Sequence, residues 1–127
     1  MTPFSKQNIT KKDIAAVTKV LKSDFLTQGP KVLEFEKKIS KYVKSKYTIT
    51  SNSGSSSLHL ACLALGLKKN DIVWTVPNTF AASANCAINC GAKIDFVDID
   101  TETWNIDTKS LQKKLIESKK KIDYLKF

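Results

Sequence analysis

The sequence contains no arginine, and this absence bears on what its charge can mean. Lysine supplies all 21 basic residues against 12 acidic ones, which gives a formal net charge of +9. A basic surface of that size can meet nucleic acid, anionic lipid or phosphorylated metabolites. Without guanidinium groups, however, the chain lacks the bidentate fork that reads guanine and grips phosphate, which weakens a nucleic-acid interpretation.

Glycine, histidine and cysteine are also scarce, and each shortage excludes a kind of site. The glycines do not fit the GxGxxG dinucleotide fingerprint or the GxxxxGK[ST] phosphate loop. His59 is the only histidine, so no second imidazole is present to share a metal. The cysteines have no CxxC spacing and predict reduced, partly buried thiols rather than zinc or disulfides: Cys62, Cys86 and Cys90. We therefore expect no metal site.

Long apolar runs are missing as well. Charged or polar residues interrupt every apolar stretch well before the ~20 positions that a membrane-spanning helix needs. The 127 residues are 42% hydrophobic and 26% charged, as in an ordinary globular domain. These features predict a cytoplasmic protein with no membrane partner.

The periodicity of apolar residues divides the chain into two parts. Residues 1–45 form a helical segment, in which the spacing predicts helices over 10–21 and 32–43 with a loop at 25–30. Residues 46–127 alternate: strands at 47–50, 71–76, 93–97 and 122–127, and helices at 56–65, 80–90 and 108–117. This alternation predicts an α/β fold with a partly parallel sheet. The helix over 56–65 is apolar on nearly every side, so we expect it to be buried.

A serine-rich turn at residues 51–57 (SNSGSSS) joins the first expected strand to a helix. Backbone N–H groups at a helix N-terminus and serine hydroxyls bind anions, so the turn suits a phosphate. Equally, the serines can simply cap the helix.

Other candidate residues have bland alternatives. His59, in a helix expected to be buried, more often makes a structural hydrogen bond than acts in catalysis. Phe80 can stack on a planar ligand if its strand neighbours the first one, but spacing alone favours a core role. Of the acidic residues near 95–100, Asp95 faces away from Asp98, while Asp98 and Asp100 shape a turn.

Four blocks of the sequence together resemble a known family. They are residues 25–30 (FLTQGP), 52–60 (NSGSSSLHL), 76–80 (VPNTF) with Ala84 and Asn85, and 91–100 (GAKIDFVDID). Their order and intervals are similar to those of the DegT/DnrJ/EryC1/StrS sugar aminotransferases. Within that family the likeness is greatest to members that aminate a UDP-linked 4-keto-6-deoxy-N-acetylhexosamine at C4 in pseudaminic-acid biosynthesis.

The resemblance implies a fold, a cofactor and contacts. The fold would be the aspartate-aminotransferase-like type I architecture, with a three-layer α/β/α large domain that begins at residues 46–127 and is incomplete here. Pyridoxal 5'-phosphate (PLP) would be the cofactor, a nucleotide sugar and an amino-acid donor such as glutamate the substrates, and a homodimer the full-length assembly. The cofactor contacts would be Gly54, Ser55, Ser56 and Phe80, and the weaker sugar or nucleotide contacts Thr27 and Gln28.

The family's Ser-x-His-x-x-Lys segment, which supplies its Schiff-base lysine, does not occur in the sequence. We therefore expect the chain to be the N-terminal part of a longer enzyme, with that lysine beyond Phe127, no catalytic residue of its own and no turnover alone. Two alternatives remain open. One is a basic nucleic-acid-binding module, and the other is a shortened, non-catalytic paralogue that pairs with full-length subunits.

Overall fold

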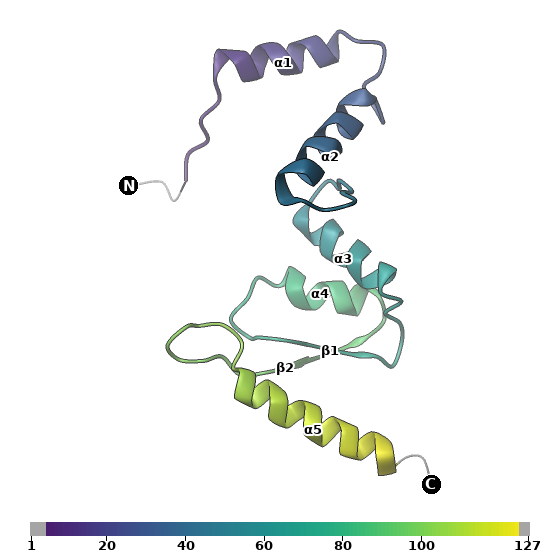
Figure 1. Cartoon of the computed structure of the whole chain (residues 1–127), viewed down its shortest axis with the longest axis vertical. Helices are drawn as coiled ribbons and strands as arrows, with labels where there is room; N and C mark the ends of the chain where they lie inside the picture. The colour runs from purple at the N-terminus through teal and green to yellow at the C-terminus, as the bar shows by residue number, and fades with distance from the viewer. Residues whose placement is uncertain (1–4, 125–127) are drawn as a thin grey trace. The chain divides into compact units, whose positions relative to one another are not determined.

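The computed structural model describes residues 5–124, which belong to two compact units, Met1–Thr50 and Ser51–Phe127 (Figure 1). The two units are described separately. Within the described residues, no helix combines the length and the apolar character needed to cross a bilayer.

The first unit contains two helices, α1 (Lys11–Leu21) and α2 (Pro30–Val43). Helix α1 begins with a capping box: the Asp13 carboxylate accepts from the Thr10 N–H at 2.7 Å, and the Thr10 hydroxyl accepts from the Asp13 N–H at 3.4 Å. Helix α2 begins at Pro30, which needs no hydrogen-bond acceptor there because it has no N–H. Both helices agree with the spacing seen in the sequence.

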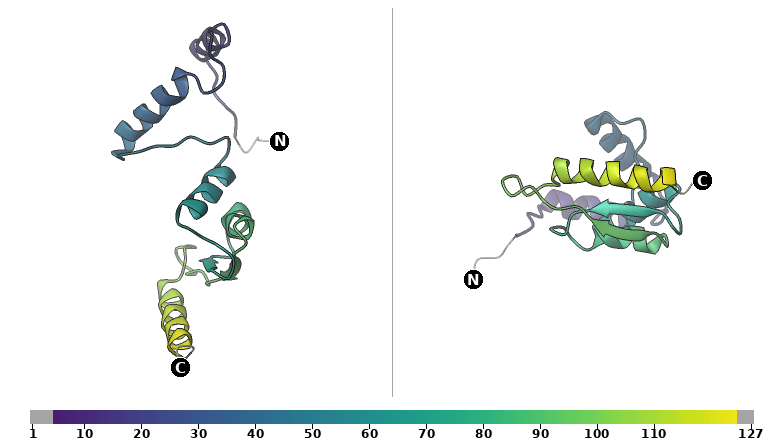
Figure 2. Two further views of the ribbon diagram at one scale, coloured as in Figure 1. Left: turned by 90° about the vertical axis from the view of Figure 1, so that its right-hand side faces the viewer. Right: turned by 90° about the horizontal axis from the view of Figure 1, so that it is seen from below.

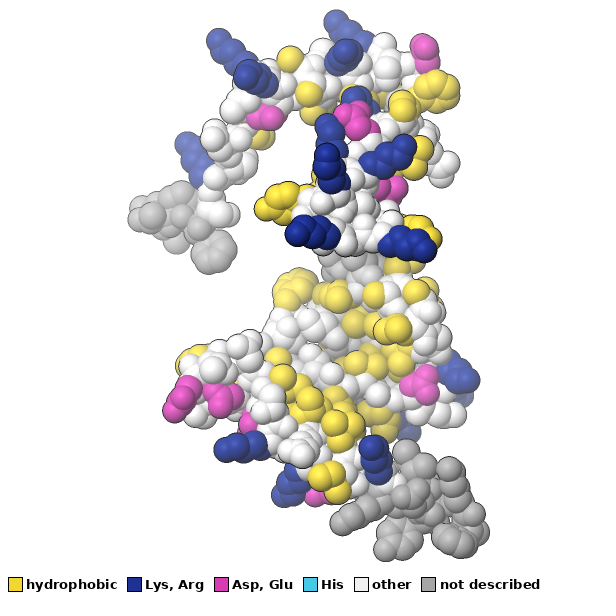
Figure 3. All heavy atoms as spheres, in the orientation of Figure 1, with side chains coloured by type: hydrophobic (Ala, Val, Ile, Leu, Met, Phe, Trp, Pro, Cys, Tyr) yellow, Lys and Arg dark blue, Asp and Glu magenta, His cyan; other side chains and the backbone are white. Residues whose placement is uncertain are grey.

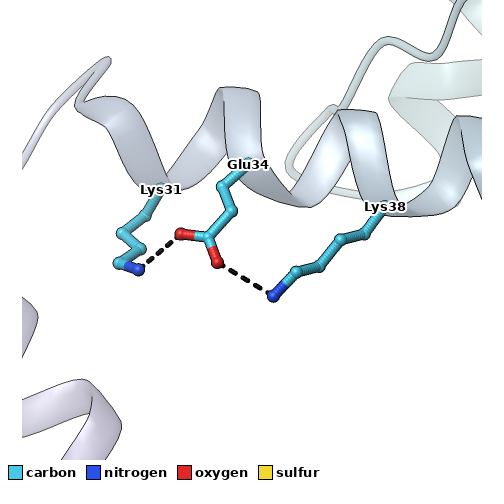
Figure 4. A network of polar contacts seen from close by, with 3 residues as sticks. All are labelled: Lys31, Glu34 and Lys38. Atoms are coloured by element: carbon cyan, nitrogen blue, oxygen red, sulfur yellow. Dashed lines mark hydrogen bonds and ion pairs between the residues drawn. The ribbon is translucent and has the colours of Figure 1, made fainter.

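An exposed ion-pair network lies on the first turns of α2 (Figure 4). The Glu34 carboxylate binds the Lys31 ammonium at 2.5 Å and the Lys38 ammonium at 2.8 Å. Hydrogen bonds from these two lysines, Lys31 first, lower the pKa of Glu34 from 4.5 to about 2. The spacings of three and four residues place all three side chains on one face of the helix.

The predicted strand at residues 47–50 is wrong, because this segment pairs with the side chains of a helix. The Glu36 carboxylate accepts from the Thr50 N–H at 2.9 Å and from the Thr50 hydroxyl at 2.8 Å. The Ser40 and Thr48 hydroxyls lie 2.7 Å apart. Strand structure needs a neighbouring strand, and the described residues of this unit provide none.

The second unit has the predicted α/β alternation. Its elements are α3 (Gly54–Ala64), β1 (Ile72–Thr75), α4 (Ala82–Asn89), β2 (Lys93–Phe96) and α5 (Thr108–Tyr124). Strands β1 and β2 pair in parallel, with Val73 opposite Ile94. Helix α4 connects them and packs on one face of the pair, while α5 lies on the other face (Figure 2). The described part thus has helix, sheet and helix layers.

Two glycines follow the ends of helices in the second unit. Gly66 follows α3 and Gly91 follows α4, both with φ of +76°. Beyond each glycine a backbone N–H returns to the helix: Leu67 to the Cys62 carbonyl and Ala92 to the Ala87 carbonyl, both at 3.1 Å. Glycine adopts this left-handed conformation without the steric cost of a Cβ, so it ends the helices there.

Helix α5 is longer than predicted. The Asp107 carboxylate accepts from the Ser110 N–H at 3.0 Å and caps the expected start. The helix continues to Tyr124, so the strand predicted at 122–127 is wrong over 122–124, while 125–127 lie outside the described residues. Leu111, Leu115 and Ile122 keep helical spacing, which explains why the helix does not end at Glu117.

A lysine holds α5 to the sheet. The Lys114 ammonium lies 2.6 Å from the Asp95 carboxylate and 5.5 Å from the centre of the Trp74 ring. The side-chain hydrogen bond from Lys114 lowers the pKa of Asp95. Trp74 and Asp95 are opposite each other in the β1–β2 register, so the Lys114 side chain joins both strands to α5.

The expected burial of α3 is wrong for the described residues. Leu58, Leu60 and Leu63 are 41%, 49% and 50% exposed. The buried core is instead small and lies around α4 and β2: Ala82, Cys86, Ala87, Ala92 and Val97. Helix α3 packs on α4 alone among the described elements, which leaves hydrophobic side chains at the surface of this unit (Figure 3).

Candidate functional site

The serine-rich turn before α3 is organised by one N-cap residue. The Ser53 hydroxyl accepts from the Ser56 N–H at 3.2 Å, and the Ser53 carbonyl accepts from the Ser57 N–H at 3.0 Å. The Ser51 and Ser57 hydroxyls bond each other. The Ser53 cap therefore explains the start of the helix, and the Ser51 and Ser57 hydroxyls are used by each other.

Capping leaves the next two residues free to bind a ligand. The N–H groups of Gly54 and Ser55 and the Ser55 hydroxyl have no partner among the described residues. A Cβ built on Gly54 would meet no heavy atom within 4 Å, so the backbone there is open to a ligand. The Ser56 hydroxyl accepts from Ser53 at 3.0 Å and keeps its own hydrogen to donate. Together with the helix dipole, these donors favour an anion.

Phe80 lies at the same hollow as this turn. The hollow measures about 230 Å³, and Ser55, Phe80 and residues on the adjacent face of α4 line it. The Phe80 side chain is 78% exposed. The structure thus brings together a helix N-terminus that favours anions and an aromatic ring that is free to stack. The sequence made this meeting depend on neighbouring strands at 47–50 and 71–76, but residues 47–50 form no strand, and the packing of α3 on α4 brings the two groups together instead.

The hollow also has two carboxamides that the sequence analysis missed as site residues. Asn85 and Asn89 are four residues apart on α4 and line the hollow beside Cys86. Their spacing from Ala81 puts them on one face of the helix, which is the signal that could have identified them.

Thr27 and Gln28 lie in the first unit, in the loop between α1 and α2. Both are exposed, and Gln28 has a φ of +50°. Gly29 follows, and a Cβ there would lie 2.9 Å from the Phe25 carbonyl oxygen, so this loop is tight. The proposed sugar or nucleotide contacts at Thr27 and Gln28 stay predictions.

The remaining candidate residues lie outside the hollow or take part in local turns. His59 is half-buried on α3 and lies outside the hollow. The Asp100 carboxylate accepts from the Thr103 N–H at 2.7 Å and so shapes a turn, as predicted. Hydrogen bonds from Thr103 lower the pKa of Asp100. The described residues contain no group of three or more ligands placed to hold a metal.

The three cysteines are free and lie where α3 meets α4. Burial, followed by the neighbouring thiols of Cys86 and Cys90, raises the pKa of Cys62. A raised pKa keeps the Cys62 thiol protonated. All three cysteines are unpaired and buried or half-buried, which agrees with the predicted reduced, partly buried thiols.

The sequence of the chain is similar to those of known proteins. The sequence profile of the DegT/DnrJ/EryC1/StrS aminotransferase family matches residues 7–123. A UDP-4-amino-4,6-dideoxy-N-acetyl-beta-L-altrosamine transaminase from Campylobacter jejuni is 48% identical over 118 residues, which are 93% of this chain and 31% of the relative.

Two solved structures show the same fold. The PLP form of a Streptococcus pneumoniae protein named as a sugar aminotransferase has a TM-score of 0.86 at 32% identity, over 88% of this chain and 29% of that one. An Escherichia coli GDP-4-keto-6-deoxy-D-mannose-3-dehydratase with bound hydrated PLP has a TM-score of 0.81 at 30% identity, over 87% and 30%. The chain thus spans about a third of the length of the relatives it matches.

Proposed function

Because the chain belongs to the DegT/DnrJ/EryC1/StrS aminotransferase family, we propose that it forms the phosphate-binding end of a PLP-dependent transaminase. The reaction moves an amino group from a donor, glutamate, to the C4 ketone of a UDP-linked 4-keto-6-deoxy-N-acetylhexosamine. The donor becomes its 2-oxo acid and the sugar ketone becomes an amine. The observation that carries this proposal is the shared hollow of Ser55 and Phe80.

The residues at the hollow fit PLP by their chemistry. PLP joins a phosphate to a flat aromatic ring, and the hollow offers unpaired N–H and hydroxyl donors at one place and an exposed phenyl ring at another. We assign the phosphate to the Gly54 and Ser55 amides and the Ser55 and Ser56 hydroxyls, and the ring to Phe80. The open space beside Gly54 allows an anion to approach the backbone.

When bound, PLP supplies the electron sink for the reaction, and the protein supplies binding and orientation. In this chain Ser55 and Ser56 hold the anionic end by hydrogen bonds, and Phe80 shields one ring face from water. Thr27 and Gln28 are our candidates for contact with the sugar or nucleotide. A homodimeric assembly and a cytoplasmic location complete the proposal.

The substrate is proposed from the C. jejuni relative, whose name places its reaction on an N-acetylated 4-amino-4,6-dideoxy sugar linked to UDP. The dehydratase with PLP shows that this fold also supports another reaction on a 4-keto-6-deoxy sugar nucleotide. No observation in the structure favours the nucleic-acid-binding alternative.

The test uses the complete natural polypeptide that carries this sequence. With glutamate and the UDP-linked ketosugar, we expect 4-amino sugar and 2-oxoglutarate in equal amounts, lost when PLP is removed and restored when it returns. Loss of a sugar hydroxyl without amine formation would refute the transaminase assignment. The 127-residue chain alone is the matched control, and we expect no turnover from it because it lacks the Ser-x-His-x-x-Lys segment.

A further inference from the structure

The hollow beside Phe80 has a polar side that the phosphate assignment does not use. Besides Ser55, the side chains along it that can form strong hydrogen bonds are the carboxamides of Asn85 and Asn89. The remaining lining is small and apolar apart from the Cys86 thiol. A ligand that fills this space therefore meets amide donors and acceptors as well as an aromatic face.

Asn85 has a fixed backbone and a free side chain. Its N–H donates to the Ala81 carbonyl at 2.9 Å, within the first turn of α4. Its carboxamide has no hydrogen-bond partner among the described residues, whereas the nearby Thr79 and Ser83 hydroxyls bond each other at 2.9 Å. Because Asn85 is exposed, its carboxamide is open to solvent and to a ligand that enters the hollow.

The position of Asn85 along α4 separates it from Asn89. Asn85 lies one helical turn beyond Ala81, the neighbour of Phe80, and Asn89 lies a further turn away, a step of about 6 Å. A ring stacked on Phe80 therefore lies nearer to Asn85. Ser55 is the phosphate-side group, so the two ends of the ligand meet different residues.

We propose that the Asn85 carboxamide is a binding residue for the cofactor, which hydrogen-bonds a polar ring substituent rather than the phosphate. This inference rests on the proposed function, because it takes PLP as the ligand of the hollow. It adds a residue on α4 to the contacts assigned from the α3 turn and Phe80. Asn85 thereby limits how the ring can rotate about its stacking axis.

The experiment measures dissociation constants in the complete polypeptide by equilibrium dialysis, with PLP and with pyridoxal, which has no phosphate. Asn85→Ala removes the carboxamide, and Asn85→Leu removes its polarity at similar volume. Asn89→Ala is the matched amide control, and Ser55→Ala is the control for the phosphate end. A neutral hydrogen bond contributes about 0.5–1.5 kcal/mol, so we expect both Asn85 variants to weaken binding roughly 2- to 12-fold.

The two ligands decide which end of the cofactor Asn85 binds. We expect the Asn85 variants to bind PLP and pyridoxal more weakly than the natural chain. Ser55→Ala should bind only PLP more weakly. The dissociation constants of Asn89→Ala should change less than twofold. The inference would be overturned if the Asn85 variants bound PLP more weakly but pyridoxal normally. It would also be overturned if the Asn85 and Asn89 variants lost the same affinity. Asn85 variants that bind both compounds as tightly as the natural chain would overturn it and leave the proposed function intact. A natural chain that binds neither compound would overturn both.

Discussion

Gly54→Val separates the binding role of the α3 turn from its folding role. Gly54 is the first residue of α3, its φ is not left-handed, and a Cβ there meets no heavy atom within 4 Å. The valine side chain therefore fits the folded chain and occupies the space through which a phosphate approaches the backbone. Since valine has a slightly better helix propensity than glycine, we expect unfolding stability to change by less than about 0.5 kcal/mol.

Binding should respond far more strongly than stability. Each hydrogen bond to a charged group contributes about 1.5–3 kcal/mol, and Gly54→Val prevents the approach to the Gly54 N–H at least. The dissociation constant for PLP should therefore rise roughly 10- to 150-fold. Equilibrium dialysis measures this in the complete polypeptide, and urea unfolding of the cofactor-free form measures stability.

The matched variant Ser53→Ala should show the opposite behaviour. It removes the hydroxyl that accepts from the Ser56 N–H at 3.2 Å, which costs about 1 kcal/mol of stability, and it leaves the Gly54 and Ser55 amides in place. We expect a lower urea midpoint and a PLP dissociation constant within about threefold of the natural one. If Gly54→Val binds PLP as tightly as the natural chain, the phosphate does not lie at this turn and the reasoning fails.

Three further predictions concern the ring, the α4 terminus and the α2 network. Phe80→Leu should weaken PLP binding roughly 2- to 12-fold and leave competition by inorganic phosphate unchanged, while Phe80→Tyr keeps the affinity; equal losses for Leu and Tyr would argue against stacking. Gly91→Ala places a Cβ at a φ of +76°, so its urea midpoint should fall by the equivalent of about 1 kcal/mol, with a smaller fall for Gly91→Asn. The Glu34 pKa of about 2 lies below its ordinary 4.5, so the ion pairs stabilise the fold above pH 4.5 and are lost as the pH falls toward 2. Its carboxyl carbon shift in NMR should therefore stay constant down to pH about 4, and a midpoint near 4.5 would contradict the network with Lys31 and Lys38.

The helix ends could be predicted from sequence because their causes are local. Thr10 and Asp13 cap α1 across three residues, and Gly66 and Gly91 end helices through their own backbone conformation. The serine turn before α3 belongs to the same class, since Ser53 and its helix partners lie within four residues. Each of these features depends on interactions that a short window of sequence contains.

The wrong predictions concern long-range or competing interactions. Residues 47–50 have strand-like composition, but strand structure requires pairing, and Thr50 bonds the Glu36 side chain 14 positions earlier instead. The apolar α3 implied burial, yet burial depends on which elements cover it, and Leu60 remains 49% exposed. At residues 122–124 helical periodicity continued from Leu115 and outweighed local β propensity.

The phosphate end and the ring end of the proposed cofactor site depend on different elements of the fold. The phosphate end forms within α3 and its cap, whereas the meeting of Phe80 with Ser55 requires α4 to lie beside α3. That placement depends on the β1–α4–β2 connection, in which Gly91 turns the chain from α4 into β2. A change that weakens this connection should therefore reduce binding of the ring before binding of the anion. Sequence alone predicts the phosphate end because it is local. The ring end could not be predicted in the same way, because the strand expected at 47–50 does not form and the packing of α3 on α4 brings Phe80 to Ser55 instead.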